Sequence, residues 1–463
     1  MESIEAFIDR LPKVELHLHL VGSASVPTVL ELAQRHPDGH VPRTEAELVT
    51  FYEFSDFPHF SRVYGAVSSL VREPADVADL VTGAARDLAR QNVRYVELTV
   101  TPYTFTAAGM PAAEVTQALD IGARTAQREH GVRVAYIFDV AGEYGAPAAE
   151  ATLEHALTSP PQALTGFGLA GIEQARPDHA EVFRAVFASA IGAGLHSVPH
   201  AGEMSGPATI WEALAGLRAE RIGHGISCLE DPRLVALLRE RQIPLEVCPT
   251  SNVCTRQVPE LAAHPLPQMV NEGLFVTLNS DDPPMFGTTL TREYRQAATV
   301  LGFGRDQLAG LAANGVRASF LEDGAKQALL AEIEAASEGD PVEGDPIEAV
   351  RPAGRVCPGI PLPLPTGPRA RRGHPLRQET RGHDEPPAGH RPAGDDGVDG
   401  DHRVAGHNGG AGHRGDPGCW AGPGGGAAVA AAVAAAGAAD RPRPGRAARH
   451  GGDTALERAA APG

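Results

Sequence analysis

The chain has 463 residues, a length that fits one large barrel domain or roughly two or three average domains. Its formal net charge is −18, and lysine occurs only at Lys13 and Lys326, so no basic stripe is present to neutralise phosphates. These features exclude nucleic acid and anionic membrane surfaces as expected partners. The first ten residues hold no basic segment followed by an apolar run, so we expect no secretory signal and a cytoplasmic protein.

Composition divides the chain near residue 336. Upstream, apolar residues recur with helical and strand periods, whereas residues 337–463 are rich in Pro, Gly, Arg and Ala and poor in large aliphatic side chains. A segment of that kind cannot bury enough apolar surface to form a core. We therefore assign residues 1–336 to one folded domain. We expect residues 337–463 to be a disordered tail, or the product of a GC-rich gene read in a shifted frame.

Eight short, apolar, β-branched segments alternate with longer helical patterns in the folded domain. The predicted strands are Val14–Leu20, Val93–Thr101, Val132–Val140, Leu164–Leu169, Leu195–His200, Arg221–Gly225, Ile243–Cys248 and Phe275–Asn279. Predicted helices include Ala75–Arg90, Ala113–Glu129 and His179–Ala193. Eight strand–helix units predict an α/β fold, a closed (β/α)8 TIM barrel, rather than an open doubly wound sheet.

The first predicted strand carries two histidines, His17 and His19, two positions apart. Because side chains alternate along a strand, both imidazoles point to the same inner side and can share one metal ion. The stretch that follows, residues 23–92, is too long for one helix. We expect its aromatic cluster partly to join the core and partly to wall the barrel mouth; the cluster is Phe51, Tyr52, Phe54, Phe57, Phe60 and Tyr64.

Polar residues also follow the fifth, sixth and eighth predicted strands, at the barrel end where active sites lie. His200 and Glu203 end the fifth strand, although a helix cap is the alternative role for Glu203. His224 stands between two glycines at the end of the sixth strand. Asp281 and Asp282 are adjacent carboxylates after the eighth strand, where a divalent cation would offset their repulsion.

These residues predict a metal centre of histidine and carboxylate ligands. The five cysteines form no CxxC pair, so a thiolate zinc site is not expected. Three histidines and one carboxylate favour a single zinc ion per chain with one position left for water, whose pKa the ion lowers to about 7. The predicted ligands are His17, His19, His200 and Asp281. Glu203, His224 and Asp282 then remain to move protons.

With those residues located, the chain resembles the adenosine/AMP deaminase family of metal-dependent, amidohydrolase-type barrels over about residues 11 to 336. Five motifs in this order carry the resemblance, and together they are highly specific. They are Glu15-Leu16-His17-Leu18-His19, Leu169-Ala170-Gly171, His200-Ala201-Gly202-Glu203, Arg221-Ile222-Gly223-His224-Gly225 and Ser280-Asp281-Asp282-Pro283.

The resemblance implies an aminohydrolase that removes the exocyclic amine of an adenine base, with zinc on the four predicted ligands. It implies that Glu203 protonates purine N1 while hydroxide attacks C6, and that His224 orients and deprotonates the zinc-bound water. Asp282 would hydrogen-bond the imidazole side of the base, and the Gly171 N–H would meet N3. The chemistry agrees, because addition to an aromatic carbon needs a nucleophile on one face and a proton donor at the ring edge.

One departure from the family pattern concerns substrate choice. Adenosine-specific members usually carry an acidic residue that binds the ribose 5′-hydroxyl where this chain has Val21. This position and residues 100–104 look similar to deaminases of 6-amino-6-deoxyfutalosine, which act in menaquinone biosynthesis. That substrate carries a benzoate, and the candidate residues to bind its carboxylate are Arg62, Ser23 and Ser25.

Three other functions stay open at the sequence level. The first is adenosine deaminase of purine salvage, with Val21 as a tolerated substitution. The second is a non-catalytic binding relative, although such a protein would be free to lose Glu203 or a metal ligand. The third is a zinc hydrolase for amides or phosphoesters, which would not need Glu203, His224 and Asp282 together. The sequence gives no indication of oligomeric state.

Overall fold

The computed structural model describes residues 2–175 and 180–338. The predicted tail beyond residue 338 therefore lies outside the described residues. Eight parallel strands form one sheet in the order of the chain, β1-β2-β3-β4-β5-β6-β7-β8. Their bounds are β1 Lys13–His19, β2 Val93–Val100, β3 Arg133–Ala141, β4 Leu164–Ala170, β5 His196–Ala201, β6 Ile222–His224, β7 Leu245–Val247 and β8 Val276–Leu278.

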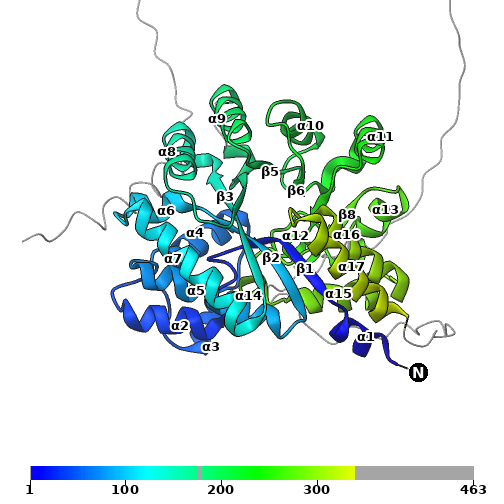
Figure 1. The fold of residues 1–463 in the computed structure, drawn as a ribbon, viewed down its shortest axis with the longest axis horizontal. Helices are drawn as coiled ribbons and strands as arrows, with labels where there is room; N and C mark the ends of the chain where they lie inside the picture. Colours follow the sequence, from blue (N-terminus) through cyan, green and yellow to red (C-terminus); the bar gives the residue numbers. More distant parts are fainter. Residues whose placement is uncertain (1, 176–179, 339–463) are drawn as a thin grey trace, which may run out of the picture. The chain divides into compact units, whose positions relative to one another are not determined.

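Helices surround the strands and connect each strand to the next (Figure 1). The longer ones are α2 Val26–Arg35, α4 Phe57–Ser68, α5 Pro74–Ala89, α7 Ala112–Thr125, α8 Gly145–Thr158, α9 Ala180–Gly192, α10 Pro207–Ala215, α11 Pro232–Arg241, α15 Leu290–Thr299, α16 Arg305–Ala318 and α17 Asp323–Ser337. The shorter ones are α1 Ile4–Arg10, α3 Glu45–Phe51, α6 Pro102–Ala107, α12 Pro249–Cys254, α13 Leu266–Asn271 and α14 Pro283–Phe286. Single turns are η1 Ala126–His130, η2 Gly142–Tyr144, η3 Glu173–Ala175, η4 Ile226–Glu230 and η5 Leu261–Ala263.

The sheet closes between its first and last strands through backbone hydrogen bonds. The amide of Asp281, just beyond β8, donates to the carbonyl of His17 at 3.0 Å, and the amide of His19 donates to the carbonyl of Asp281 at 3.2 Å. The predicted (β/α)8 barrel is thus confirmed, and each of the eight predicted strands overlaps an observed one. Within the described residues, no helix is both long enough and apolar enough to cross a membrane.

Alternate residues of each strand face two different environments. Outward side chains pack under the helices; Val14 of β1, for example, approaches α16 so closely that a Cβ on Gly315 would lie 2.6 Å from its Cγ2 atom. Several inward positions carry charged side chains, as at Glu97 of β2 and Glu246 of β7, both fully buried. The strands are therefore buried on both faces, which is why their sequences read as nearly continuous apolar runs.

The segment between β1 and β2 forms four helices, α2 to α5, instead of the usual single crossover helix. Its aromatic cluster packs against α14, which directly follows the two aspartates beyond β8. The ring centroids of Phe54 and Phe60 lie 6.1 Å and 5.0 Å from that of Phe286. Tyr64 instead stands edge-on to His19 at 6.4 Å. The cluster thus contributes both to the core and to the wall beside the barrel mouth.

Candidate active site

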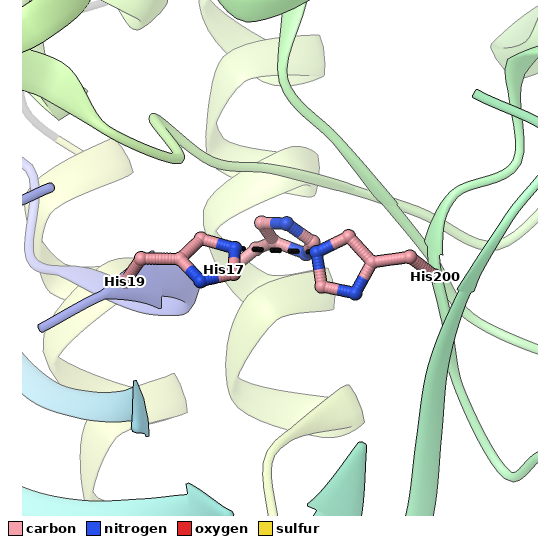
Figure 2. Close-up of side chains that lie close together, drawn as sticks. All are labelled: His17, His19 and His200. Carbon is pink, nitrogen blue, oxygen red and sulfur yellow. Dashed lines mark hydrogen bonds between the residues drawn. The ribbon is translucent and has the colours of Figure 1, made fainter. Parts of the chain in front are cut away.

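Three buried imidazoles meet at the carboxyl ends of β1 and β5 (Figure 2). His17 and His19 come from β1, and their ring nitrogens lie within 4.8 Å of a nitrogen of His200 from β5. The Nε2 atoms of His19 and His200 face each other at 3.2 Å. Asp281 joins from the end of β8, with its Oδ1 atom 3.3 Å from His19 Nε2 and 3.5 Å from His17 Nε2.

These donors fit a divalent cation. The Nε2 atom of His17 is buried and has no hydrogen-bond partner within the described residues. Three imidazole nitrogens and a carboxylate oxygen converging from three strand ends form the donor set that zinc-type ions prefer. The residues present therefore suit a metal ion, and the sequence prediction of His17, His19, His200 and Asp281 names the residues that the fold brings together.

The backbone at this site is held in uncommon conformations. His224 and Asp281 both have left-handed backbones, with φ of 60° and 66°. Side-chain-bearing residues adopt that region rarely, and such strain is concentrated at functional sites. Gly223 is required for a different reason: a Cβ there would lie 2.8 Å from His17 Cε1 and would push the histidines apart.

Buried hydrogen-bond partners orient two members of the cluster. Glu246 Oε2 lies 2.8 Å from Nδ1 of His17, and Glu246 Oε1 accepts a 2.6 Å hydrogen bond from Nε of Arg221. Ser251 Oγ, in α12, donates to Oδ2 of Asp281 at 2.6 Å. Contacts of this kind fix the ring orientation and the ligand basicity of metal-binding side chains.

Glu203 is held beside the imidazole cluster by the turn after β5. Glu173 of η3 accepts hydrogen bonds from the backbone amides of Glu203, at 3.1 Å, and Ser205, at 2.8 Å. The carboxylate of Glu203 lies 3.6 Å from His224 Nε2 and accepts from Thr255 Oγ1 at 3.4 Å. Burial, with the negative charges of Asp281 and Glu173 nearby, raises the pKa of Glu203 to about 8. This glutamate is therefore protonated near neutral pH and can donate a proton.

His224 and Asp282 have their pKa values shifted in opposite directions by the same environment. Burial, together with the nearby His17, lowers the pKa of His224 to about 3, so this imidazole is neutral. Burial and the adjacent Asp281 raise the pKa of Asp282 well above its usual value. Asp282 Oδ1 is buried without a hydrogen-bond partner among the described residues. A buried set of one proton acceptor and two proton donors suits acid–base chemistry.

The predicted substrate-binding residues occupy different positions. Gly171 follows β4 with φ of +83°, and a Cβ there would lie 1.9 Å from Glu143 Oε2, so glycine is required. Val21 is buried and lines a small hollow together with Tyr64 of α4. Arg62 is exposed on α4, and no hydrogen bond or ion pair among the described residues joins it to the histidine cluster.

Ser23 and Ser25, the two serines named with Arg62, make local contacts in the structure. Ser23 Oγ donates to the carbonyl of Leu20 at 2.9 Å. Ser25 Oγ caps the start of α2, where it accepts from the amide of Thr28 at 3.4 Å. Their hydroxyl groups thus support the turn between β1 and α2.

Sequence reasoning missed three residues of this site. Glu246 is a charged position inside an otherwise apolar strand segment, a signal that could have identified it. Ser251 and Asn252 lie in α12, the short helix after β7, and β7 is the one strand from β5 to β8 whose end we left without a functional residue. Asn252 contacts His224 Nδ1 at 3.3 Å and His264 Nε2 at 3.2 Å through its side-chain amide.

This fold and this site define the class of barrel hydrolases that work at a histidine–carboxylate metal centre. The family model for adenosine deaminase matches residues 12–336. The chain therefore belongs to the adenosine deaminase family and is a deaminase of adenine-type substrates, as the resemblance predicted.

Individual relatives agree with this assignment. An aminodeoxyfutalosine deaminase from Streptomyces coelicolor is 50% identical over 335 residues, which cover 72% of this chain and 86% of that protein. The crystal structure of an adenine deaminase from Arthrobacter aurescens has a TM-score of 0.67 and 34% identity, covering 70% of this chain and 98% of that one. An amidohydrolase from Burkholderia ambifaria, solved with bound Zn, has a TM-score of 0.67 and 26% identity, covering 73% and 95%.

Proposed function

We propose that this protein is a zinc-dependent deaminase that converts 6-amino-6-deoxyfutalosine to futalosine and ammonia, in the cytoplasm, as a step of menaquinone biosynthesis. The observation that carries the proposal is Val21. This residue is buried in the turn after β1, and it offers no hydrogen bond to a 5′-hydroxyl in the hollow that it lines. The name of the Streptomyces coelicolor relative, aminodeoxyfutalosine deaminase, supports the same substrate.

The assigned zinc ligands are His17, His19, His200 and Asp281. When bound, zinc lowers the pKa of water and so supplies a nucleophile near neutral pH. The protein's own contribution begins with Glu246, which holds the ring of His17 through Nδ1. A fixed ring orientation is needed because a ligand set binds tightly only when its donors already point to one centre.

The remaining polar groups match the edges of an adenine base. Protonated Glu203 donates to N1, which makes C6 more electrophilic, while neutral His224 orients the attacking water and accepts its proton. Purine N7 is an acceptor, and Asp282, whose pKa is raised, can donate to it. The amide of Gly171 is assigned to N3. These contacts orient the base. The two protons of the attacking water balance the reaction, because one replaces the proton that Glu203 gives to N1 and the other leaves with the amine as ammonia.

The hollow beside Val21 has a mixed lining without a charged side chain. Its apolar residues are Leu20, Val21, Val100 and Phe105, and its hydroxyl-bearing residues are Tyr64, Ser68, Thr99, Thr101 and Thr104. Because no carboxylate lines the hollow, a substrate that carries a larger group in place of the 5′-hydroxyl leaves no charged acceptor unsatisfied there. Arg62 remains our candidate to bind the benzoate carboxylate, and this role requires its exposed side chain to reach the rim of the hollow.

The deciding experiment compares three substrates with the zinc-loaded protein under identical conditions. The change in ultraviolet absorbance on deamination measures the rate. We expect kcat/KM for 6-amino-6-deoxyfutalosine to exceed the values for adenosine and for adenine. A preference for adenosine would assign the enzyme to purine salvage, which is the second candidate. A preference for free adenine would contradict both nucleoside functions.

Introducing an acid at position 21 should move the preference towards adenosine. The Val21→Asp variant provides an acceptor for the 5′-hydroxyl, and a hydrogen bond to a charged group changes the ratio of kcat/KM values by about 10- to 100-fold. Val21→Ala is the matched control, because it makes space without adding an acceptor. Equal ratios in the two variants would show that position 21 does not face the 5′ position.

Removal of the metal should abolish turnover without unfolding the barrel. We expect dialysis against dipicolinate to eliminate deamination, and one equivalent of Zn²⁺ to restore it, because the ligands come from preformed strand ends. Elemental analysis should find one zinc ion per chain in the native protein and none in a His17→Ala, His19→Ala double variant. Persistent activity in protein shown to be metal-free would refute the metal assignment.

A further inference from the structure

Asp139, a buried carboxylate near the end of β3, has no role in the chemistry described so far. It is 1% exposed and pairs in register with Gly168 of β4. Gly168 pairs with Val198 of β5, which lies two positions before His200 on the same strand face. Since His200 points into the barrel, Asp139 also points inward. A Cβ on Gly168 would lie only 3.2 Å from that of Asp139, so the two positions lie on one face and the glycine avoids a tight contact there.

The carboxylate of Asp139 is only half satisfied. Thr101 Oγ1 donates to its Oδ1 atom at 2.6 Å. Its Oδ2 atom is buried without a hydrogen-bond partner, and no arginine or lysine pairs with it among the residues that the structure describes. A buried carboxylate oxygen without a donor is unfavourable, so a bound ligand that supplies the missing donor gains affinity.

The position of Asp139 and Thr101 relative to the proposed metal ligands limits which part of a substrate can donate a hydrogen bond to Asp139. Thr101 lines the same hollow as Val21 and Tyr64, and its hydroxyl donates to Asp139. Asp139 therefore lies next to the residues that line this hollow. The assigned metal ligands and proton-transfer groups come from β1, β5, β6 and β8, whereas Thr101 and Asp139 come from β2 and β3. The reacting C6 of the base must face the first group of strands.

The rest of the substrate then extends towards β2 and β3. The sugar of a purine nucleoside is attached at N9, on the ring that does not contain C6, and its 2′- and 3′-hydroxyls are hydrogen-bond donors. The inward position on β4 next to Asp139 is Gly168, which adds no side chain to this part of the barrel. A second carboxylate, such as the benzoate of the proposed substrate, would be repelled by Asp139.

We propose that Asp139 accepts a hydrogen bond from a ribose 2′- or 3′-hydroxyl and so selects nucleosides with an intact ribose over their deoxy counterparts. This assignment rests on the proposed nucleoside deaminase function, and it makes Asp139 a specificity residue. Thr101 holds the carboxylate in place through Oδ1, and Oδ2 is the oxygen that remains to accept a hydrogen bond from the sugar.

The test compares nucleosides that differ by one hydroxyl. We would measure kcat/KM of the wild-type zinc enzyme for 5′-deoxyadenosine, 2′,5′-dideoxyadenosine and 3′,5′-dideoxyadenosine. The wild type should prefer 5′-deoxyadenosine, which keeps both the 2′- and the 3′-hydroxyl, over one dideoxy analogue by about 10- to 100-fold, the effect of a hydrogen bond to a charged group. In Asp139→Ala this ratio should fall below about threefold. In the volume-conserving Asp139→Asn, whose amide makes only an uncharged hydrogen bond, it should fall below the wild-type ratio. The zinc content should stay unchanged.

The ratio compares the kcat/KM values of two nucleosides with the same variant. A general loss of folded protein lowers both values equally and leaves the ratio unchanged. An equal decrease of kcat/KM for all three nucleosides in the Asp139 variants would show that Asp139 only supports the fold. A wild type that does not discriminate between them would also overturn the proposal. If adenosine proves to be the preferred substrate while the ratio still collapses in the variants, the futalosine function fails and the role of Asp139 stands.

Discussion

Replacement of Glu203 by glutamine should lower kcat by about 100- to 10,000-fold, the usual contribution of a positioned acid or base. Glutamine keeps the shape of the side chain and its contact with Thr255. It removes the proton that Glu203 carries because burial raises its pKa to about 8. The amine of adenine leaves only after the aromatic ring accepts a nucleophile, and without protonation of N1 that addition is slow.

Three measurements separate this effect from a structural one. The zinc content of the Glu203→Gln variant should equal that of the wild type, because Glu203 is not among the residues that converge as candidate ligands. Its melting temperature should stay unchanged or rise, since a buried acid is replaced by a neutral amide. The exposed Glu230→Gln variant is the matched control and should keep full activity. Wild-type turnover by Glu203→Gln would exclude this residue as the proton donor.

Replacement of Arg221 by methionine should destabilise the barrel by about 3–5 kcal/mol, the cost of leaving buried charges without their partner. Arg221 is 1% exposed and contacts both Glu97 and Glu246, while its NH1 group donates to the carbonyl of Ala318 at 2.9 Å. Its guanidinium also lies 4.0 Å from the ring centroid of Phe320. Methionine fills a similar volume but leaves two buried carboxylates uncompensated.

The same variant should also bind zinc more weakly. Glu246 connects Arg221 to His17, so a displaced Glu246 no longer fixes that ring, and losses of this kind typically reach about 10- to 100-fold in metal affinity. Urea unfolding would measure the stability, and competition with a chromogenic chelator would measure the affinity. Arg233→Met, at an exposed ion pair with Asp231, should change the stability by less than about 0.5 kcal/mol.

A triple variant without the unpaired carboxylates tests the same explanation more strictly. Combining Arg221→Met with Glu97→Gln and Glu246→Gln removes the unpaired charges and should recover part of the lost stability. The affinity for zinc should stay low, because the neutral amide introduced by Glu246→Gln is a weaker partner for His17 than the native carboxylate. A stability loss of under about 1 kcal/mol in Arg221→Met alone would show that water reaches these carboxylates.

The sequence by itself determined the barrel and the main polar residues at its mouth. Buried parallel strands read as short apolar runs, so the eight segments could be located from local pattern alone. The spacing of His17 and His19 placed both on one strand face for the same reason. The other ligand candidates were found because they end predicted strands, and the carboxyl ends of barrel strands meet at one rim.

The tertiary structure alone decided how these residues are supported and which further groups join them. His17 and its partner Glu246 are 229 positions apart, and only the closed barrel brings them to 2.8 Å. No sequence pattern predicts that one oxygen of Asp139 lacks a hydrogen-bond donor, because this depends on which donors surround the carboxylate in space. The same holds for Gly223, whose missing side chain makes room for His17. Local patterns report burial and direction, whereas hydrogen-bond partners depend on strands that are distant in the chain.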